Sequence, residues 1–154
     1  MRLFSQYCRT LEYAVAIADA PAVPLDAEDI GRVHSFEECL MVMVGVEQGD
    51  ADTSRVSAAA KAVNRICRNT QVTPKRVVLN AFAGLADRRI CADPAEADAA
   101  VAALADRLKA RGHDVHVMPF GWNKEWSATV APGVWEQRVV ELKPSADRLE
   151  PGAR

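Results

Sequence analysis

The sequence predicts a single α/β domain in which one β-sheet packs against two main helices. A continuous apolar run at residues 39–46 is typical of a central strand that is buried on both faces. Apolar residues then recur at helical spacing in residues 53–69 and again after residue 93. A length of 154 residues is most simply one domain, and it is enough to bury a proper core.

Two short strands are predicted at the start of the chain, at residues 3–7 and 11–17. The second strand alternates clearly, because one face carries Leu11, Tyr13, Val15 and Ile17. Residues 8–10 would then form a hairpin turn. Residues 18–38 lose this periodicity and gain prolines and acidic residues, which predicts a long loop. A loop of this length in a compact domain is often functional or mobile.

Both predicted helices have defined starts. Asp52 or Thr53 can cap the first helix, which ends near Asn69 and buries Val56, Ala59, Ala60, Val63, Ile66 and Cys67. The second helix starts with Asp93 as its cap, proline at its first position and Glu96 at its third, an arrangement that satisfies free backbone N–H groups. Gly112 is expected to end it.

Three further strands follow from short apolar segments. The strand at 77–79 opens into the small residues at 80–84, and such strand ends are where ligands usually lie in α/β domains. A strand at 115–117 leads into an aromatic stretch. A last strand is expected at 135–142.

The stretch from Phe120 to Trp126 holds three large aromatic side chains, one glycine and one lysine. Pro119 and Gly121 predict a bend, because proline fixes φ and glycine tolerates unusual backbone angles. Lys124 follows the bend among aromatic neighbours. Two interpretations stay open at this point. The ammonium is held against apolar rings and stabilises a developing negative charge, or it is a solvated lysine in a hairpin with packed tryptophans.

The composition limits the classes of function. The values of 49% hydrophobic and 26% charged residues are ordinary for a globular protein. A net charge of -2 and a pI near 5.9 argue against a broad nucleic-acid groove, but leave room for a protein that grips only the end of an RNA. With no apolar run of about 18 residues and no leader pattern, a cytoplasmic protein without membrane contact is expected.

Motifs for metals and common cofactors are absent from the sequence. It contains no phosphate-binding, dinucleotide-binding or nucleophile-elbow motif. The histidines at 34, 113 and 116 lack ligand spacing, so no metal site is expected. The four cysteines are far apart and are expected to be reduced, mostly buried thiols, with a catalytic cysteine as a remote alternative.

Several short motifs occur in the order seen in the archaeal-type editing domain of threonyl-tRNA synthetase. The sequence VMPFGWNK at residues 117–124 resembles the PFGYYK motif of that family, and AFA at 81–83 resembles its PFAH segment. The opening residues 1–13 look like its first two strands. The sequence VGVE at 44–47 is similar to a strand end in the same family.

The resemblance covers roughly residues 1–142 and leaves residues 143–154 as a C-terminal tail. It implies a D-aminoacyl-tRNA deacylase-like fold, which is an α/β sheet with two main helices in a single domain. No aminoacylation domain accompanies these residues, so the resemblance implies a freestanding member that acts in trans. It also implies a homodimer, because small α/β domains with apolar strand faces often pair.

The resemblance implies a catalytic centre at Lys124, which stands where the family has the lysine of PFGYYK. A cationic lysine can stabilise the oxyanion formed in ester hydrolysis and help to position the water. The preceding family tyrosine is Asn123 here, which can hold a water or a ribose oxygen. A late family glutamate corresponds to Glu136 after a shift in the alignment, with Gln137 as the competing match. The alternative for Glu136 is an exposed strand residue.

The same resemblance implies that the substrate-binding residues are Ala81, Phe82, Ala83, Gly84, Phe120, Gly121 and Trp122. The ring of Trp122 would replace the ring lost with the family tyrosine. Gly84 stands in place of the family histidine, in the wall that meets the amino-acid side chain. We therefore expect an acyl group other than the serine that the archaeal domain clears.

The implied function is hydrolysis in trans of the ester of a mischarged threonine tRNA, at its 3′-terminal aminoacyl-adenosine and without a metal or organic cofactor. Seryl-tRNA and threonine analogues such as 4-fluorothreonyl-tRNA are the candidate substrates. Two alternatives stay open. One is a non-catalytic module that binds an amino acid or an RNA end. The other is an enzyme in which Lys124 forms a Schiff base with a small carbonyl substrate.

Overall fold

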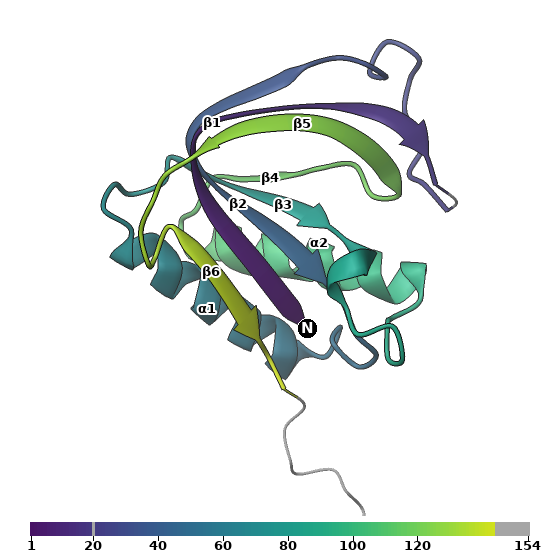
Figure 1. Cartoon of the computed structure of the whole chain (residues 1–154). Helices are drawn as coiled ribbons and strands as arrows, with labels where there is room; N and C mark the ends of the chain where they lie inside the picture. The colour runs from purple at the N-terminus through teal and green to yellow at the C-terminus, as the bar shows by residue number, and fades with distance from the viewer. Residues whose placement is uncertain (20, 144–154) are drawn as a thin grey trace, which may run out of the picture.

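In the computed structural model, the sheet is built around one long strand, β1 (Arg2–Ala18). Its partners are all antiparallel: β2 (His34–Gly45) along most of its length, β6 (Gln137–Glu141) near its start and β5 (Trp122–Val130) along its second half. In Figure 1, β6 and β5 follow one another along the same edge of β1. One strand thus connects two parts of the sheet.

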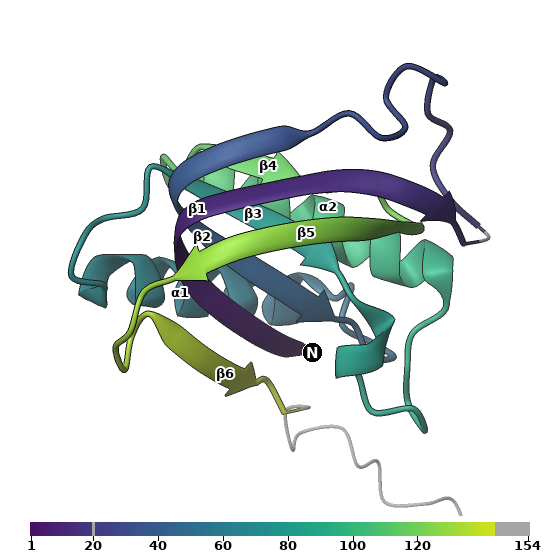
Figure 2. The ribbon, with the colours of Figure 1, turned by 45° about the horizontal axis from the view of Figure 1, so that its top comes forward.

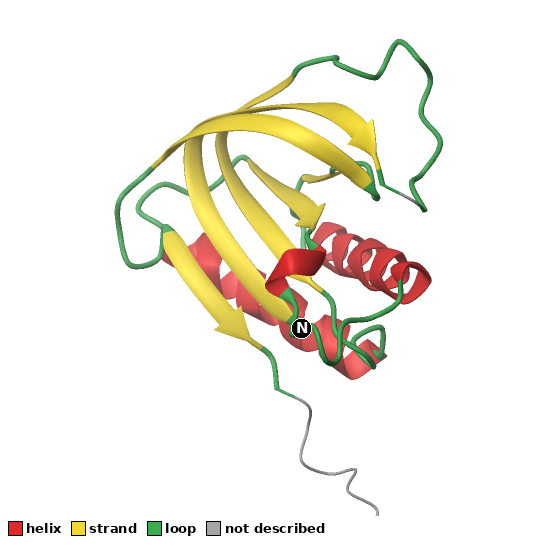
Figure 3. Ribbon diagram, turned by 45° about the vertical axis from the view of Figure 1, so that its right-hand side comes forward, coloured by secondary structure: helices red, strands yellow, loops and turns green. Residues whose placement is uncertain are grey.

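The other edge of β2 carries the parallel part of the sheet. Here β2 pairs with β3 (Arg76–Ala81), which pairs in turn with β4 (Val115–Val117). The crossovers are α1 (Thr53–Asn69) and α2 (Pro94–Ala110), and both helices cover the same face of the sheet (Figure 3). A short 3-10 helix (Ala83–Leu85) follows β3. The α/β class with two main helices is therefore confirmed.

The side-chain caps expected for both helices are present. Asp52 accepts a hydrogen bond from the backbone N–H of Ser54, and Asp93 accepts one from Glu96. Proline at the first position of α2 costs nothing, because its missing N–H has no partner within a helix. These caps fix where both helices begin, at the end of the sheet where β2 and β3 finish.

The core has two parts, one on each face of the sheet. The larger part lies under the helices and includes Leu3, Leu40, Val63, Leu79, Leu104 and Leu108. The second part fills the opposite face with Leu11, Tyr13, Val15, Met41, Val78 and Met118. Residues 39–42 are at most 1% exposed, which confirms a central strand buried on both faces. In Figures 1 and 2 the second half of β1 and β5 curve over the face that the helices leave free.

The predicted hairpin at the start of the chain is wrong, because β1 is one continuous strand. The break in alternation at residues 8–10 is a β-bulge in the pairing with β5, where Cys8 pairs with Val130 and Thr10 with Thr129. Opposite this stretch, on β2, Glu38 has a φ of 50°, which is rare for a residue other than glycine. A bulge interrupts the period of two and bends a strand without ending it.

Three element boundaries also differ from the sequence prediction. The strand β2 begins at His34, so the predicted loop at 18–38 shortens to the residues between Ala18 and His34. The aromatic stretch continues as β5 to Val130, where no strand was expected. The last strand, β6, is shorter than predicted.

The structure describes residues 1–19 and 21–143. From residue 144 on, the predicted tail lies outside the described residues, so the domain boundary at residue 142 stays a prediction. Within the described part, neither helix has the length and apolar character needed to cross a membrane.

Candidate functional site

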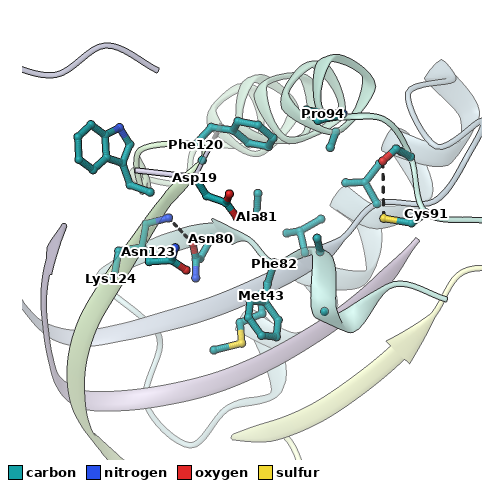
Figure 4. Close-up of a pocket in the computed structure, with 18 of the residues that line it drawn as sticks. Asp19, Met43, Asn80, Ala81, Phe82, Cys91, Pro94, Phe120, Asn123 and Lys124 are labelled. Carbon is teal, nitrogen blue, oxygen red and sulfur yellow. Dashed lines mark hydrogen bonds between the residues drawn. The ribbon is translucent and has the colours of Figure 1, made fainter. Parts of the chain in front are cut away.

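A cavity of about 500 Å³ opens at the end of the sheet where β2 and β3 finish. Its walls come from these strand ends, the 3-10 helix, the start of α2 and the first half of β5 (Figure 4). The volume falls in the range of cavities that hold small ligands. Nine of the ten predicted site residues line this cavity, and the exception is Glu136.

Lys124 projects from β5 into the cavity and is partly buried. Its Nζ donates a hydrogen bond to Oδ1 of Asn80, at 2.9 Å (Figure 4). Burial lowers the pKa of Lys124 from 10.5 to about 8. Among the described residues no carboxylate forms an ion pair with this ammonium. The cavity therefore holds a cation that is oriented by a neutral amide.

The curl of the sheet creates this contact, because β5 and β3 are not neighbours in it. Asn80 lies near the end of β3 and is only 7% exposed. Lys124 pairs with Val15 of β1, and the next pairing, Ile17 with Asn123, follows a register shift. Such a bulge bends its strand and re-aims the neighbouring side chains. It lies beside Lys124, at the place where β1 and β5 bend over the cavity.

The residues around Lys124 divide between the cavity wall and its rim. Trp122 is partly buried, and its indole N–H donates to the carbonyl of Val23 at 2.8 Å. Trp126 is 46% exposed, so its ring offers an open aromatic face at the mouth. Asn123 is exposed and also lines the cavity. Aromatic rings at an open rim can stack on a planar ligand group.

Gly121 closes one side of the rim. Its φ is +79°, and a Cβ at this position would lie 2.5 Å from the carbonyl oxygen of Pro21. The carbonyl of Gly121 accepts from the N–H of Asp19 at 2.7 Å, and that of Phe120 accepts from Val23 at 3.0 Å. The bend predicted here is therefore present. It holds the first part of the loop before β2 against the cavity.

The segment after β3 forms the opposite wall. The N–H of Phe82 donates to the carbonyl of Val44 at 2.9 Å, and the 3-10 helix begins at the next residue. Gly45 allows this close approach, since a Cβ there would lie 2.7 Å from the backbone nitrogen of Ala86. Ala81 and Ala83 line the cavity with small side chains, which leaves backbone accessible to a ligand.

Comparison with known proteins identifies the family. The family model of the Archaea-specific editing domain of threonyl-tRNA synthetase matches residues 1–133. The chain belongs to this family. A "Threonine--tRNA ligase" of Thermofilum pendens is 36% identical over 126 residues, which are 80% of this chain and 20% of that protein. The chain thus spans about a fifth of this relative's length. Membership of this family supports a role in tRNA editing in general.

A solved structure confirms the fold. The "c-Myc DNA Unwinding Element Binding Protein" superimposes with a TM-score of 0.66, covering 94% of this chain and 100% of that chain. The two sequences are only 10% identical, so this likeness concerns the fold alone. The predicted D-aminoacyl-tRNA deacylase-like fold is the one observed.

Gly84 and Asn123, at which the sequence resemblance predicts departures from the family motif, both line the cavity. The ring of Phe82 covers Gly84, because a Cβ on Gly84 would meet two ring carbons at 3.2 Å. Phe82 is 48% exposed, so this ring takes the place that a larger residue at 84 would need. Asn123 offers a side-chain amide at the cavity.

Glu136 lies away from the cavity, so the structure does not bring it to the predicted catalytic centre. It is 4% exposed rather than an exposed strand residue, and its Oε1 accepts from the N–H of Gln71 at 2.8 Å. Its carbonyl accepts from the N–H of Tyr7 at 2.7 Å. Gln137 donates to the carbonyl of Ala131 and is not in the cavity either. The side chain of Glu136 thus joins two loops of this editing domain.

Sequence reasoning missed several residues of the cavity wall, namely Asp19, Met43, Asn80, Cys91, Pro94, Ala97 and Trp126. Asn80 and Trp126 lie just outside the recognised motifs at 81–83 and 117–124, so their position close to Ala81 and Lys124 was a usable signal. The others come from distant elements and carry no such signal. In the described part of the chain, no group of three or more His, Cys, Asp or Glu side chains has the arrangement to hold a metal ion.

Proposed function

We propose that this chain hydrolyses, in trans, the ester of a mischarged threonine tRNA. The observation that carries the proposal is Lys124, a partly buried ammonium in a cavity of ligand size, held 2.9 Å from Asn80 and free of carboxylate partners among the described residues. A cation in a poorly solvated site stabilises a developing oxyanion more strongly than one in bulk water. Ester hydrolysis needs such a group at the carbonyl.

The proposed reaction uses water as the nucleophile. A water oxygen attacks the ester carbonyl carbon, and the ammonium of Lys124 donates a hydrogen bond to the oxyanion that forms. The bond between that carbon and the ribose oxygen then breaks, and the ribose oxygen takes up the proton that the attacking water loses. The products are the free amino acid and a tRNA with its terminal hydroxyl restored. Asn80 keeps the ammonium in place, and the side-chain amide of Asn123 at the rim is positioned to hold a water or a ribose oxygen.

The acyl group follows from the wall at Gly84. An imidazole is absent there, and the ring of Phe82 lies over the glycine. An apolar wall of this kind favours an acyl group with more carbon than serine, because the added methyl or fluoromethyl group of a threonine analogue gains from apolar contact. Threonine analogues such as 4-fluorothreonine are therefore the preferred candidates, with serine as the reference substrate.

A deacylation panel tests the proposal. Threonine tRNA charged separately with serine, threonine and 4-fluorothreonine is incubated with wild type, Lys124→Ala and Lys124→Arg. We expect wild type to release one amino acid rapidly, and we expect Lys124→Ala to lose at least about a hundredfold, the size of one oxyanion donor. Full activity in Lys124→Ala would rule out the assigned role. No release by wild type would leave a module that binds without turnover.

A second candidate function rests on the same lysine. A pKa of about 8 makes the neutral amine of Lys124 accessible near neutral pH, as Schiff-base enzymes require. Borohydride reduction in the presence of a carbonyl substrate would then leave a mass adduct on Lys124. An adduct found together with an inactive tRNA panel would favour this function over deacylation.

The proposal also includes a homodimer. It includes a cytoplasmic location because tRNA editing accompanies translation. Light scattering after gel filtration measures the oligomeric state directly. A monomer at micromolar concentration would remove the dimer from the proposal without affecting the reaction.

A further inference from the structure

The exposed side of α1 carries positive charge only. Its seventeen residues include four arginines or lysines and no carboxylate, although the whole chain has a net charge of -2. Lys61, Arg65 and Arg68 are all exposed and stand four and three residues apart, so they share one face of the helix. This face lies opposite the buried stripe that ends at Ile66 and Cys67. We call these three residues the α1 ridge.

The charges of the α1 ridge are not neutralised within the described part of the chain. None of the three side chains has a carboxylate oxygen within 4.0 Å, whereas Arg55 of the same helix pairs with Asp50. The guanidinium of Arg65 lies 5.4 Å from the ring centre of Trp135. The guanidinium of Arg138, on β6, lies 4.3 Å from the centre of the same ring. A fixed guanidinium beside an aromatic ring is pre-organised to bind phosphate.

The α1 ridge lies on a helix that begins close to the cavity. Val44 and Val46, at the end of β2, line the cavity, and α1 begins a short turn later at Thr53. The helices α1 and α2 run in parallel, since Arg107 donates to Ser57 and the ring of His113 bonds to Asn64. At 1.5 Å per residue, the ridge starts about 12 Å from the beginning of α1 and extends for about 10 Å.

We propose that the α1 ridge binds the phosphate backbone of the tRNA acceptor stem while the aminoacylated 3′ end occupies the cavity. This inference rests on the proposed function, and it adds the surface that holds the RNA. Three cations in a row, without carboxylate partners among the described residues, match successive phosphates of one strand, and such contacts position a nucleic acid without reading its sequence. They also explain how a chain with a net negative charge can hold an RNA by its end.

The test replaces charge without touching the cavity or the contact between Arg65 and Trp135. The ridge variant combines Lys61→Gln and Arg68→Gln. The matched control combines Arg9→Gln and Lys109→Gln, which removes the same charge from exposed residues elsewhere and includes one cation in the last turn of α2. Thermal unfolding of both variants shows that they are folded. A single Arg65→Gln variant then probes the middle of the ridge.

Two readouts separate failure of this inference from failure of the proposed function. The first is the Kd for uncharged threonine tRNA across a salt series, which needs no catalysis. We expect the ridge variant to bind about tenfold more weakly, and the slope of log Kd against log salt to fall by about two. The control should match wild type. If the ridge variant and the control bind equally, the inference is overturned, and the ridge becomes a candidate face for an acidic protein.

The second readout is deacylation of full-length aminoacyl-tRNA and of an aminoacylated CCA trinucleotide. We expect the ridge variant to raise KM for the full tRNA about tenfold, with kcat unchanged and with no effect on the trinucleotide. An equal loss on both substrates would mean that the ridge acts through the cavity, which contradicts the inference. If wild type hydrolyses neither substrate while the ridge variant still loses tRNA affinity, the proposed reaction is wrong and the RNA surface stands.

Discussion

The pH dependence of deacylation tests whether Lys124 works as a cation. Burial lowers its pKa from 10.5 to about 8. At that pKa about 90% of the molecules carry the ammonium at pH 7, and about 10% carry it at pH 9. If the ammonium stabilises the oxyanion, the rate of the chemical step should fall about ninefold between these two values.

The assay is single-turnover deacylation from pH 6 to 9.5. Spontaneous ester hydrolysis rises with hydroxide concentration, so the rate without protein is subtracted at every pH. Lys124→Arg is the matched control, because a guanidinium stays charged over the whole range. Its profile should be flat through pH 8, whatever its absolute rate.

The direction of the pH dependence shows whether the protonated or the neutral form of Lys124 is active. A rate that rises through pH 8 would mean that the neutral amine of Lys124 is the working form, as a Schiff-base or general-base role requires. A wild-type profile as flat as that of Lys124→Arg would show that the charge of Lys124 does not affect the measured step. Either result contradicts oxyanion stabilisation by the ammonium.

Three further substitutions test other parts of the site. Gly121→Ala should lower the free energy of unfolding by about 2–4 kcal/mol, because it combines a strained φ of +79° with a backbone clash at 2.5 Å. Urea denaturation measures this loss. Gly84→His should displace the ring of Phe82 and change the ratio of kcat/KM between seryl- and 4-fluorothreonyl-tRNA at least about tenfold. Glu136→Ala should cost about 1–3 kcal/mol in unfolding free energy, through the loss of a buried acceptor, and leave the rate of deacylation unchanged.

Each of these substitutions has a control or a contrary outcome. Gly49 has a φ of +85° and open space around the place of a Cβ. The variant Gly49→Ala therefore measures the cost of the backbone angle alone, about 1–2 kcal/mol of unfolding free energy. An equal loss in both glycine variants would mean that the rim does not constrain Gly121. Gly84→Ala adds the Cβ without the imidazole. If Gly84→His leaves the substrate preference unchanged, the wall does not select the acyl group. A slow but stable Glu136→Ala variant would return Glu136 to the catalytic candidates.

The parallel half of the fold was predictable from the sequence, and the antiparallel half was not. The apolar run at 39–46 and the caps Asp52 and Asp93 are local signals, and each determines its element without long-range information. Local signals do not reveal β1 as one strand, because the bulge between Cys8 and Thr10 in its pairing with β5 interrupts the alternation, as a turn would. Only pairing with β2, more than twenty residues away, shows that the chain continues straight through.

The site was predictable where a motif carried it. The resemblance at residues 117–124 and 81–83 brought Lys124 and Ala81 to one cavity, as the structure finds. It also indicated Glu136, which lies elsewhere. The chain departs from the family motif at that point, so the match depended on a shift in alignment. Burial at 4% with backbone partners is a property of the fold that residue type alone does not reveal.

Asn80 determines what Lys124 can do, and it lies one residue before the recognised motif at 81–83. An aspartate at the same 2.9 Å would neutralise the ammonium and keep its pKa high, because an opposite charge nearby favours the charged form. The oxygen of an asparagine orients the ammonium and leaves its charge uncompensated in a half-buried cavity. The pKa then falls towards neutrality while most molecules remain protonated at pH 7. The cavity therefore gains favourable electrostatic energy only when a negative charge appears within it, and this is the condition for stabilising an oxyanion more than the neutral ester.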